Sequence, residues 1–256
     1  MKILGRYFWV PRYLYKRYWQ RRYYYESILR RRSAWFVTME GVTIQLGFIS
    51  PYHHSIAQGM SGGAWEKEAV HAWAELCKEH ANTGQVIYDI GGYNGMYGIM
   101  AAKIDPSAKV FIYEPDPVNA RQCRMNIKLN NLSDNRVVVR EMALSDVEGM
   151  VKFQADGYTG AAIGKGGAYE LRSERLDTQQ PRPSIMKIDI EGAEADMLLA
   201  APETLKAKPR ILLELHAVVP EEKRRVMWDM LKRVGYHWQQ LPSEIAAAEE
   251  PHYVLR

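Results

Sequence analysis

Two short segments in the second half of the chain combine apolar residues with charged side chains at alternate positions. In Ile-Met-Lys-Ile-Asp-Ile-Glu, the period of two of an extended chain places Lys187, Asp189 and Glu191 on one side. In Ile-Leu-Leu-Glu-Leu-His, the same period places Glu214 and His216 together. Charges buried in a sheet must pair with one another or with a ligand. These side chains therefore form either a structural ion-pair cluster or an active site that works by acid–base chemistry.

The elements that would position these side chains alternate in type from residue 85 onward. Short apolar runs predict strands, and apolar residues on one helical face predict helices. The predicted strands are 85–90, 109–114, 136–141, 150–155, 184–190, 210–216, 236–241 and 252–255, and the predicted helices are 65–80, 94–103, 117–129, 194–200 and 221–234. This alternation indicates an α/β fold with a mainly parallel sheet and helices on both faces. Ligands of such sheets bind at the carboxyl ends of the strands.

The first of these strands ends in Asp89-Ile-Gly91-Gly92-Tyr93-Asn-Gly95. Glycine lets a backbone turn tightly and approach a ligand closely. No register of the segment fits the dinucleotide pattern GxGxxG or the phosphate-binding Walker pattern. An acid before the glycines suits a cationic ligand, and S-adenosylmethionine carries an ammonium and a sulfonium group. The segment is predicted to bind this cofactor, and a glycine-rich turn without a ligand is the alternative.

The next two strand ends also suit a nucleoside. Glu114, in Tyr-Glu-Pro-Asp-Pro, can accept hydrogen bonds from two ribose hydroxyls, and Pro115 and Asp116 follow it. Nicotinamide cofactors use such an acid as well, so Glu114 predicts nucleoside binding without choosing the cofactor. Asp116 also fits the N-cap of the following helix. Met142 and Ala143 follow the third strand, where an adenine ring would lie.

Taken together, these motifs resemble the FkbM family of S-adenosylmethionine-dependent methyltransferases. The resemblance covers roughly residues 40–256 and rests on DIGGYNG at 89–95, YEPDP at 113–117, ALSD at 143–146, KIDIEGAE at 187–194 and LELH at 213–216. Tyr93 stands where the family commonly has Asn. The resemblance implies a class I methyltransferase fold, a Rossmann-like and mostly parallel seven-stranded sheet. It also implies O-methylation of a sugar, glycolipid or natural-product hydroxyl, with Glu66 in Gly-Ala-Trp-Glu at the amino-acid end of the cofactor.

If the chain transfers a methyl group to a hydroxyl, the polar side chains at the strand ends can be given roles in that reaction. An alcohol is a poor nucleophile at neutral pH, so a base beside it accelerates in-line attack. His216 is predicted as this base because imidazole titrates near neutrality, with Asp189 as its partner or replacement and Lys187 holding Asp189 ionised. A divalent metal held by Asp189, Glu214 and His216 is the alternative. No metal is expected, because Lys187 already provides a cation.

The positive charge of the chain is concentrated at its N-terminal end. Residues 1–32 hold ten basic residues, one acidic residue and ten of the 28 aromatic residues, and the rest of the chain carries −5 because the whole carries +4. Such an arm suits an anionic membrane surface, a helix packed on the body or on a second subunit, or single-stranded RNA. The acidic body argues against a nucleic-acid groove, so nucleic acid is not an expected partner.

Three parts are predicted: the arm at 1–34, a hairpin and loop cap at 35–63, and an S-adenosylmethionine-binding domain at 64–256. The hairpin turns at Glu40-Gly41, and His53-His54 could cover the substrate pocket. The glycine-rich segment 157–167 is a substrate lid or a plain surface loop.

Composition and targeting signals narrow the class of protein further. No apolar run reaches 18 residues, no secretory signal pattern occurs, and Cys77 and Cys123 form no metal or redox motif. A cytoplasmic protein is expected, bound peripherally to a membrane if the arm binds lipid. A nicotinamide-dependent oxidoreductase and a catalytically silent cofactor-binding module that serves a partner stay open, although the missing GxGxxG counts against the first. Neither the acceptor nor the oligomeric state has a signature in the sequence.

Overall fold

The computed structural model describes residues 34–49, 53, 57, 60, 66–154, 162–163, 169–242 and 250–256 of the 256-residue chain. Residues 1–33 of the predicted arm lie outside the described residues. So do His54 and the segment 157–167, apart from a two-residue strand at Ala162–Ile163. In the part of the chain that is described, no helix has the length and apolar character needed to span a membrane.

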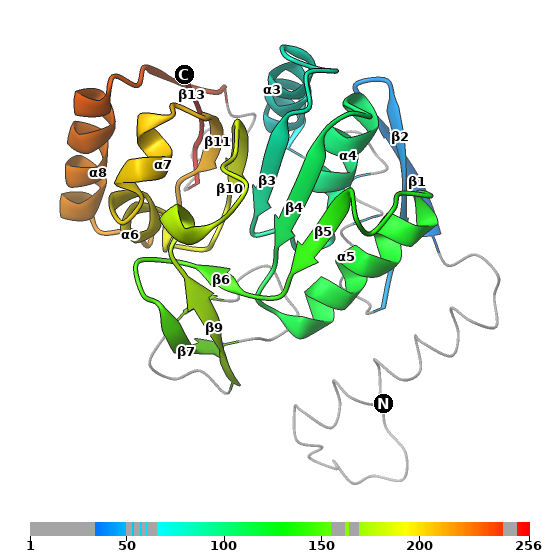
Figure 1. The fold of residues 1–256 in the computed structure, drawn as a ribbon, viewed down its shortest axis with the longest axis horizontal. Coiled ribbons are helices and arrows are strands. Elements are labelled where there is room, and N and C mark those ends of the chain that lie inside the picture. The colour runs from blue at the N-terminus through cyan, green and yellow to red at the C-terminus, as the bar shows by residue number, and fades with distance from the viewer. Residues whose placement is uncertain are drawn as a thin grey trace, which may run out of the picture.

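A seven-stranded sheet with the order β12-β13-β11-β10-β3-β4-β5 forms the centre of the fold (Figure 1). All neighbouring strands are parallel except at β13, which runs antiparallel to β11 and β12. The predicted, mostly parallel seven-stranded sheet is therefore confirmed. Its strands are β3 (Val86–Ile90), β4 (Lys109–Tyr113), β5 (Val137–Arg140), β10 (Ile185–Ile188), β11 (Arg210–Glu214), β12 (Trp238–Gln240) and β13 (His252–Leu255). The chain order reverses between β3 and β10, where sheets of this type bind ligands.

Helices cover both faces of the sheet, as predicted (Figure 1). One face carries α3 (Lys67–Lys78), α4 (Met96–Ile104) and α5 (Pro117–Leu129), and the other carries α6 (Glu194–Leu199), α7 (Pro202–Lys206) and α8 (Glu221–Val234). Successive strand residues point to opposite faces of the sheet. Ile87 and Val110 belong to the apolar cluster under α3–α5, whereas Tyr88 and Phe111 belong to the cluster under α6–α8. Strands buried on both faces are continuous apolar runs, which is why the sequence predicts them.

A second sheet of four short strands, in the order β6-β9-β7-β8, lies outside the central one. Only β7 (Gly149–Gln154) matches a predicted strand; β6 (Ala143–Leu144), β8 (Ala162–Ile163) and β9 (Tyr169–Glu174) are additions. The 3-10 turn η1 (Leu176–Thr178) follows β9. Strand β9 was missed because it reads Tyr-Glu-Leu-Arg-Ser-Glu, and its inward-facing positions, Leu171 and Ser173, include only one apolar residue.

The predicted hairpin is formed by β1 (Ala34–Met39) and β2 (Val42–Gly47), and its turn is Glu40-Gly41. Both turn residues have positive φ, 49° and 76°, as a tight two-residue hairpin turn requires. Apolar side chains of both strands, such as Leu46, join the core under α3–α5. The hairpin is thus packed against the body of the protein.

Side-chain amides of α5 dock the edge of β2 that faces away from β1. Gln122, Asn126 and Asn130 are spaced four residues apart and share one face of the helix. Their side-chain oxygens accept the backbone N–H groups of residues 49, 47 and 45 over 2.8, 2.8 and 2.9 Å. Gln122 and Asn130 also donate to the backbone carbonyls of Gly47 and Gln45. The helix therefore satisfies this edge of β2 as a neighbouring strand would.

Asn126→Ala is expected to lower the free energy of unfolding by about 1–3 kcal/mol, measured by urea denaturation. The buried Asn126 accepts from Gly47 N and from Gln122, and it donates to the carbonyl of Asn94. Alanine leaves the Gly47 and Asn94 backbone groups without these partners. Arg121→Ala, on the exposed face of the same helix, is the control, with an expected change below about 0.5 kcal/mol. Equal losses in the two variants would contradict the docking role.

Candidate active site

The turn that follows β3 lies against the residue that follows β10. Gly91 and Gly92 both donate their backbone N–H groups to the carbonyl of Tyr113, over 2.9 and 3.1 Å. Gly91 has a φ of 85°, and a Cβ atom there would lie 1.6 Å from the carbonyl oxygen of Asp189. Glycine is needed at this position for both reasons. The turn therefore brings the carboxyl ends of β3, β4 and β10 together.

Asp89, the acid before the glycines, is buried inside β3. Its Oδ2 accepts the backbone N–H of Gly98 in α4 over 2.8 Å. Among the described residues, its Oδ1 has no hydrogen-bond partner. Burial raises the pKa of Asp89 to about 6, against the lowering effect of the Lys187 ammonium. A buried carboxylate oxygen that lacks a partner suits a cationic ligand group.

Glu114, the acid after β4, lies beside the same turn. Its Oε2 accepts the backbone N–H of Tyr93 over 2.7 Å, and its Oε1 accepts that of Asp116 over 2.8 Å. Burial raises the pKa of Glu114 to about 8. Asp116 itself caps α5, because its Oδ1 accepts the N–H groups of Val118 and Asn119. The N-cap alternative is therefore confirmed for Asp116.

The end of the third strand adjoins Glu114. The backbone N–H groups of Glu114 and Met142 both donate to the carbonyl of Arg140, each over 3.0 Å. Met142 also packs against the apolar cluster on the α6–α8 face, and Ala143 starts strand β6. The predicted cofactor residues at the ends of β3, β4 and β5 thus lie next to one another.

Lys187, which is buried, and Asp189, which is partly exposed, form an ion pair. Lys187 Nζ lies 2.6 Å from Asp189 Oδ2 and 4.6 Å from the centre of the Tyr97 ring. Burial disfavours the charge of Lys187, but the carboxylates of Asp189 and Asp89 outweigh burial and raise its pKa. Burial also disfavours the Asp189 carboxylate, and the Lys187 ammonium outweighs it and lowers the pKa of Asp189. The Lys187 ammonium therefore favours the ionised form of Asp189, and the part of Lys187 in catalysis stays a prediction.

His216 lies among three carboxylates. Its Nδ1 is 2.7 Å from Glu194 Oε1, and its Nε2 is 3.4 Å from Glu191 Oε2 and 3.7 Å from Asp189 Oδ1. Burial disfavours the imidazolium ion, but Glu194, Asp189 and Glu191 together outweigh burial and raise the pKa of His216 to about 9. Burial raises the pKa of Glu191 to about 7. The imidazole therefore titrates well above the neutral range on which its predicted role as a base was argued.

A second group of polar side chains extends the cluster towards α4 and β13. The hydroxyl of Tyr97 donates to Glu66 Oε2 over 2.7 Å. Glu214 Oε2 lies 3.2 Å from His252 Nε2, and the Glu214 carboxylate outweighs burial and raises the pKa of His252. Glu66 was placed near the cofactor by resemblance alone, and in the structure it neighbours Glu214 and His252.

Two triads in this cluster have the composition of metal sites. The ligating atoms of Asp189, Glu214 and His216 lie within 4.8 Å of one another, as do those of Glu66, Glu214 and His252. The Lys187 ammonium, 2.6 Å from Asp189, already neutralises part of the first triad. A divalent cation there would be repelled by this ammonium.

Addition of EDTA is expected to leave the rate of the predicted methyl transfer unchanged within about twofold, because Lys187 supplies the positive charge beside Asp189. The rate should be measured with and without EDTA, and then with added Mg²⁺ or Mn²⁺. Loss of activity in EDTA that either ion restores would contradict this prediction and favour the metal alternative.

The loop cap contacts the glycine turn through His53. This side chain is buried, with Nε2 3.1 Å from Asn119 Oδ1, and its ring stacks on Tyr93 with centres 5.1 Å apart. Burial lowers the pKa of His53 to about 4, so the ring is uncharged at neutral pH. His53 therefore packs on the predicted cofactor turn.

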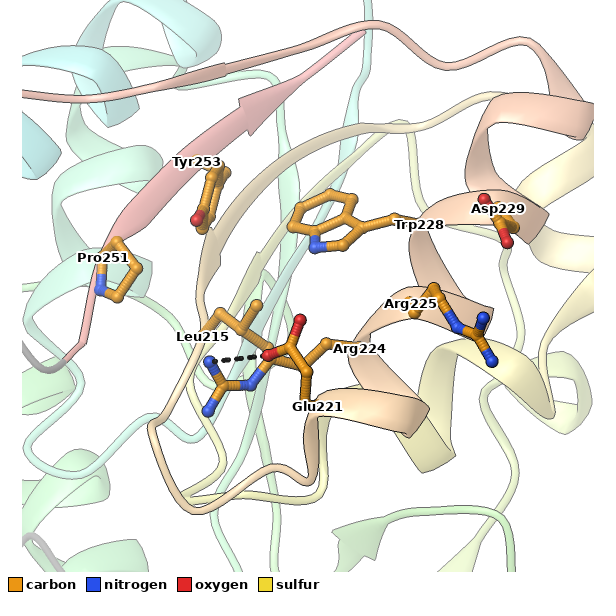
Figure 2. Close-up of a pocket in the computed structure, with 8 residues that line it drawn as sticks. All are labelled: Leu215, Glu221, Arg224, Arg225, Trp228, Asp229, Pro251 and Tyr253. Carbon is orange, nitrogen blue, oxygen red and sulfur yellow. Dashed lines mark ion pairs between the residues drawn. The ribbon is translucent and has the colours of Figure 1, made fainter.

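A separate hollow of about 320 Å³ lies beside α8, on the face of the sheet that carries α6–α8 (Figure 2). Trp228 and Tyr253 lie next to each other in its lining, with ring centres 5.0 Å apart and ring planes inclined at 63°. None of the predicted catalytic or cofactor residues lines this hollow. Its lining is Leu215, Glu221, Arg224, Arg225, Trp228, Asp229, Pro251 and Tyr253.

The structure thus brings the main predicted residues to one edge of the sheet and adds others. Glu194, which contacts His216, received no role from the sequence, and Glu191 was placed only on the charged side of the predicted strand. The signal for them was present: KIDIEGAE places two more acids shortly after Asp189, in the turn and first helical residue that follow β10. The partners of Tyr97 and His252 come from distant segments, so no local pattern indicates them.

Comparisons with known proteins concern the fold and the family of the chain. A crystal structure from Clostridium thermocellum, described provisionally as an rRNA methylase, has a TM-score of 0.50 and 13% sequence identity, and the match covers 74% of this chain and 94% of that one. At this identity the likeness shows the fold alone, which is that of a class I methyltransferase. The sequence profile of the methyltransferase FkbM domain matches residues 89–238. The chain belongs to the FkbM methyltransferase family, as its motifs predict.

Two curated relatives are similar to part of the chain. A hexuronic acid methyltransferase, AglP of Haloferax volcanii, is 23% identical over 157 residues, which are 56% of this chain and 61% of the relative. A 2-O-methyltransferase, NoeI of Sinorhizobium fredii, is 27% identical over 146 residues, which are 47% of this chain and 58% of the relative. The chain therefore spans about three fifths of the length of these relatives.

Proposed function

We propose that the chain transfers a methyl group from S-adenosylmethionine to a hydroxyl of a sugar, a glycolipid or another natural-product acceptor. Membership of the FkbM family supports methyl transfer, and two relatives named for hexuronic acid methylation and 2-O-methylation support a saccharide hydroxyl. One observation carries the proposal: Gly91 fits directly against the backbone of Asp189. The predicted cofactor turn and the polar cluster around His216 consequently share one edge of the sheet.

The residues at this edge suit S-adenosylmethionine, which supplies an electrophilic methyl group on its sulfonium sulfur when bound. Asp89 Oδ1, buried and without a hydrogen-bond partner in the described ranges, suits a cationic part of the cofactor. The Glu114 carboxylate suits the ribose hydroxyls, since each of its oxygens accepts one backbone N–H and has capacity for another bond. Met142 adjoins Glu114 and suits the adenine. Glu66 suits the amino-acid end.

On the acceptor side, the residues of the chain act on the hydroxyl proton. His216 Nε2, in its neutral form, accepts that proton as the oxygen bonds to the methyl carbon. Asp189 and Glu191, 3.7 and 3.4 Å from Nε2, then stabilise the imidazolium ion that results. Lys187 keeps Asp189 ionised and so keeps this stabilisation in place.

Incubation with methyl-labelled S-adenosylmethionine and a panel of cell fractions tests the proposal. Glycolipid, oligosaccharide, RNA and protein fractions are compared, with the His216→Gln variant as the matched negative control. Label is expected in a saccharide or glycolipid fraction, in an alkali-stable ether linkage, and only with the unaltered chain. Label confined to RNA or protein would contradict the proposed acceptor class.

The basic and aromatic arm supports a separate prediction about membranes. Deletion of residues 1–34 is expected to reduce co-sedimentation with anionic liposomes, because each Lys or Arg near such a surface contributes about 1 kcal/mol of attraction. Binding of S-adenosylmethionine should be unchanged, since all the proposed cofactor residues lie after the arm. Liposomes of phosphatidylcholine alone serve as the uncharged control. Equal sedimentation of the full and shortened chains would contradict membrane binding by the arm.

A further inference from the structure

The carboxylate of Glu194 is completely buried beneath His216. Glu194 is the first residue of α6, and its Oε1 lies 2.7 Å from His216 Nδ1. Its Oε2 has no hydrogen-bond partner among the residues described. A carboxylate removed from water in this way is destabilising unless a partner compensates for the lost hydration. The partner that the structure provides is the imidazole of His216.

The same carboxylate also orders the turn between β10 and α6. Glu194 Oε1 accepts the backbone N–H of Gly192 over 2.9 Å and that of Ile190 over 3.3 Å. This turn holds Glu191 at a φ of 55°, a left-handed conformation that is strained for a residue other than glycine. Glu194 therefore fixes two things at once: the ring of His216 and the backbone that carries Glu191.

We propose that Glu194 is a positioning residue for His216: by binding Nδ1 it directs Nε2 towards Asp189 and Glu191, where the acceptor hydroxyl would be deprotonated. The catalytic part of this proposal rests on the methyl transfer proposed above. The geometry on which it depends is independent of the acceptor. A hydrogen bond from Nδ1–H to a carboxylate selects the tautomer whose Nε2 is free to accept a proton.

The charges around His216 determine what a variant of Glu194 would do. Asp189 and Glu191 face Nε2 from the end of β10 and the turn after it, and Glu194 faces Nδ1 from α6. On the strands, Glu214 pairs with His252 of β13, while Lys187 pairs with Asp189. Glu194→Gln keeps the shape of the side chain and removes one of the negative charges that stabilise the imidazolium ion.

The test follows the histidine rings by NMR in protein labelled with ¹⁵N-histidine, in EDTA and without cofactor or acceptor. His216→Gln identifies the His216 signals by their loss. In the unaltered chain, neutral His216 is expected as the Nδ1–H tautomer. In Glu194→Gln, the pKa of His216 is expected to fall by about one to three units, as when an adjacent opposite charge is removed.

Two further variants keep the test decisive. Asp196→Asn, on the same helix and paired with Lys223 at the surface, is the matched control and should leave His216 unchanged. Glu194→Asp keeps the charge but shortens the side chain, so it should change the tautomer populations of His216 and shift the pKa of His216 less than glutamine does. Glu194→Asp also replaces Glu194→Gln if the glutamine variant does not fold. A folded Glu194 variant whose His216 has the tautomer and pKa of the unaltered chain would overturn the proposal.

The kinetic counterpart is a lower kcat in Glu194→Gln at a pH above about 9, where His216 is neutral in the unaltered chain as well, with an unchanged Kd for S-adenosylhomocysteine. Because the NMR experiment contains no substrate, it separates the two proposals. Normal His216 behaviour in the variant would overturn positioning by Glu194 even if methyl transfer is found. Conversely, the expected shift in a chain that binds no S-adenosylhomocysteine would leave the geometric link intact and contradict only the proposed function.

Discussion

At a pH above about 9, where His216 is neutral, His216→Gln is expected to lower kcat for methyl transfer by about 10²–10⁴-fold, the usual contribution of a general base. Glutamine at this position cannot accept the hydroxyl proton, while Asp189, Glu191 and Glu194 stay in place. The Kd for S-adenosylhomocysteine should change by less than about twofold, because the proposed cofactor contacts come from other residues. Radiometric methyl transfer and calorimetry give the two quantities.

The pH dependence of the unaltered enzyme follows from the same cluster. His216 has a pKa of about 9, so it is protonated at neutral pH and cannot accept a proton there. The value of kcat/KM, which reports the free enzyme, is therefore expected to rise with pH through about 9 and to level above it. The His216→Gln variant should lose this rise.

A histidine outside the cluster provides the control for this prediction. His237 is exposed, and its backbone exchanges two hydrogen bonds with that of Arg256, so His237→Gln should keep both the rate and its pH profile. A His216→Gln enzyme with the rate and pH profile of the unaltered chain would contradict the role of His216 as the base.

Gly91→Ala is expected to abolish cofactor binding and to destabilise the fold by more than about 2 kcal/mol. The added Cβ would lie 1.6 Å from the carbonyl oxygen of Asp189, and each of the two residues directly follows a strand of the pair β3–β10. Alanine also adopts the φ of 85° at this position only with strain. The backbone must shift where β3 and β10 meet, and that shift moves the turn away from Asp189. Thermal unfolding and calorimetry measure the two effects.

Gly84→Ala is the matched control for Gly91→Ala. Gly84 has a similar φ, 74°, and a Cβ there would meet nothing within 4 Å. Its substitution carries only the conformational penalty, about 1–2 kcal/mol, and should leave cofactor binding intact. Similar losses of binding in the two variants would show that contact with Asp189 is not what makes Gly91 necessary.

The central sheet and the main site residues were predictable because their signals are local. Parallel strands buried on both faces are apolar runs, and each carries its polar residue at its carboxyl end, as Asp89, Glu114 and Asp189 do. The glycines after β3 report the close backbone contact at that turn. Helix α8 and strand β13 were predicted with their observed bounds, 221–234 and 252–255, because their apolar periods are clear.

The remainder depends on contacts between distant residues. Strand β10 ends at Ile188, earlier than its apolar pattern indicates. The chain turns at Glu191, and the Glu194 side chain stabilises this turn by accepting the backbone N–H of Gly192. The pKa of His216 depends on three carboxylates that only the folded chain assembles. Similarly, His252 is separated from Glu66 by most of the chain. No pattern in the sequence near these residues contains that information.

The central claim is that the turn after β3 and the polar ends of β10 and β11 form one site for S-adenosylmethionine. Calorimetric titration with S-adenosylhomocysteine tests it most directly, at two temperatures because binding heat passes through zero at one. The account predicts saturable binding of one molecule per chain, weakened about tenfold or more by Glu114→Ala, which removes the ribose contact. No saturable heat at either temperature, or equal affinity in the Glu114→Ala variant, would contradict it.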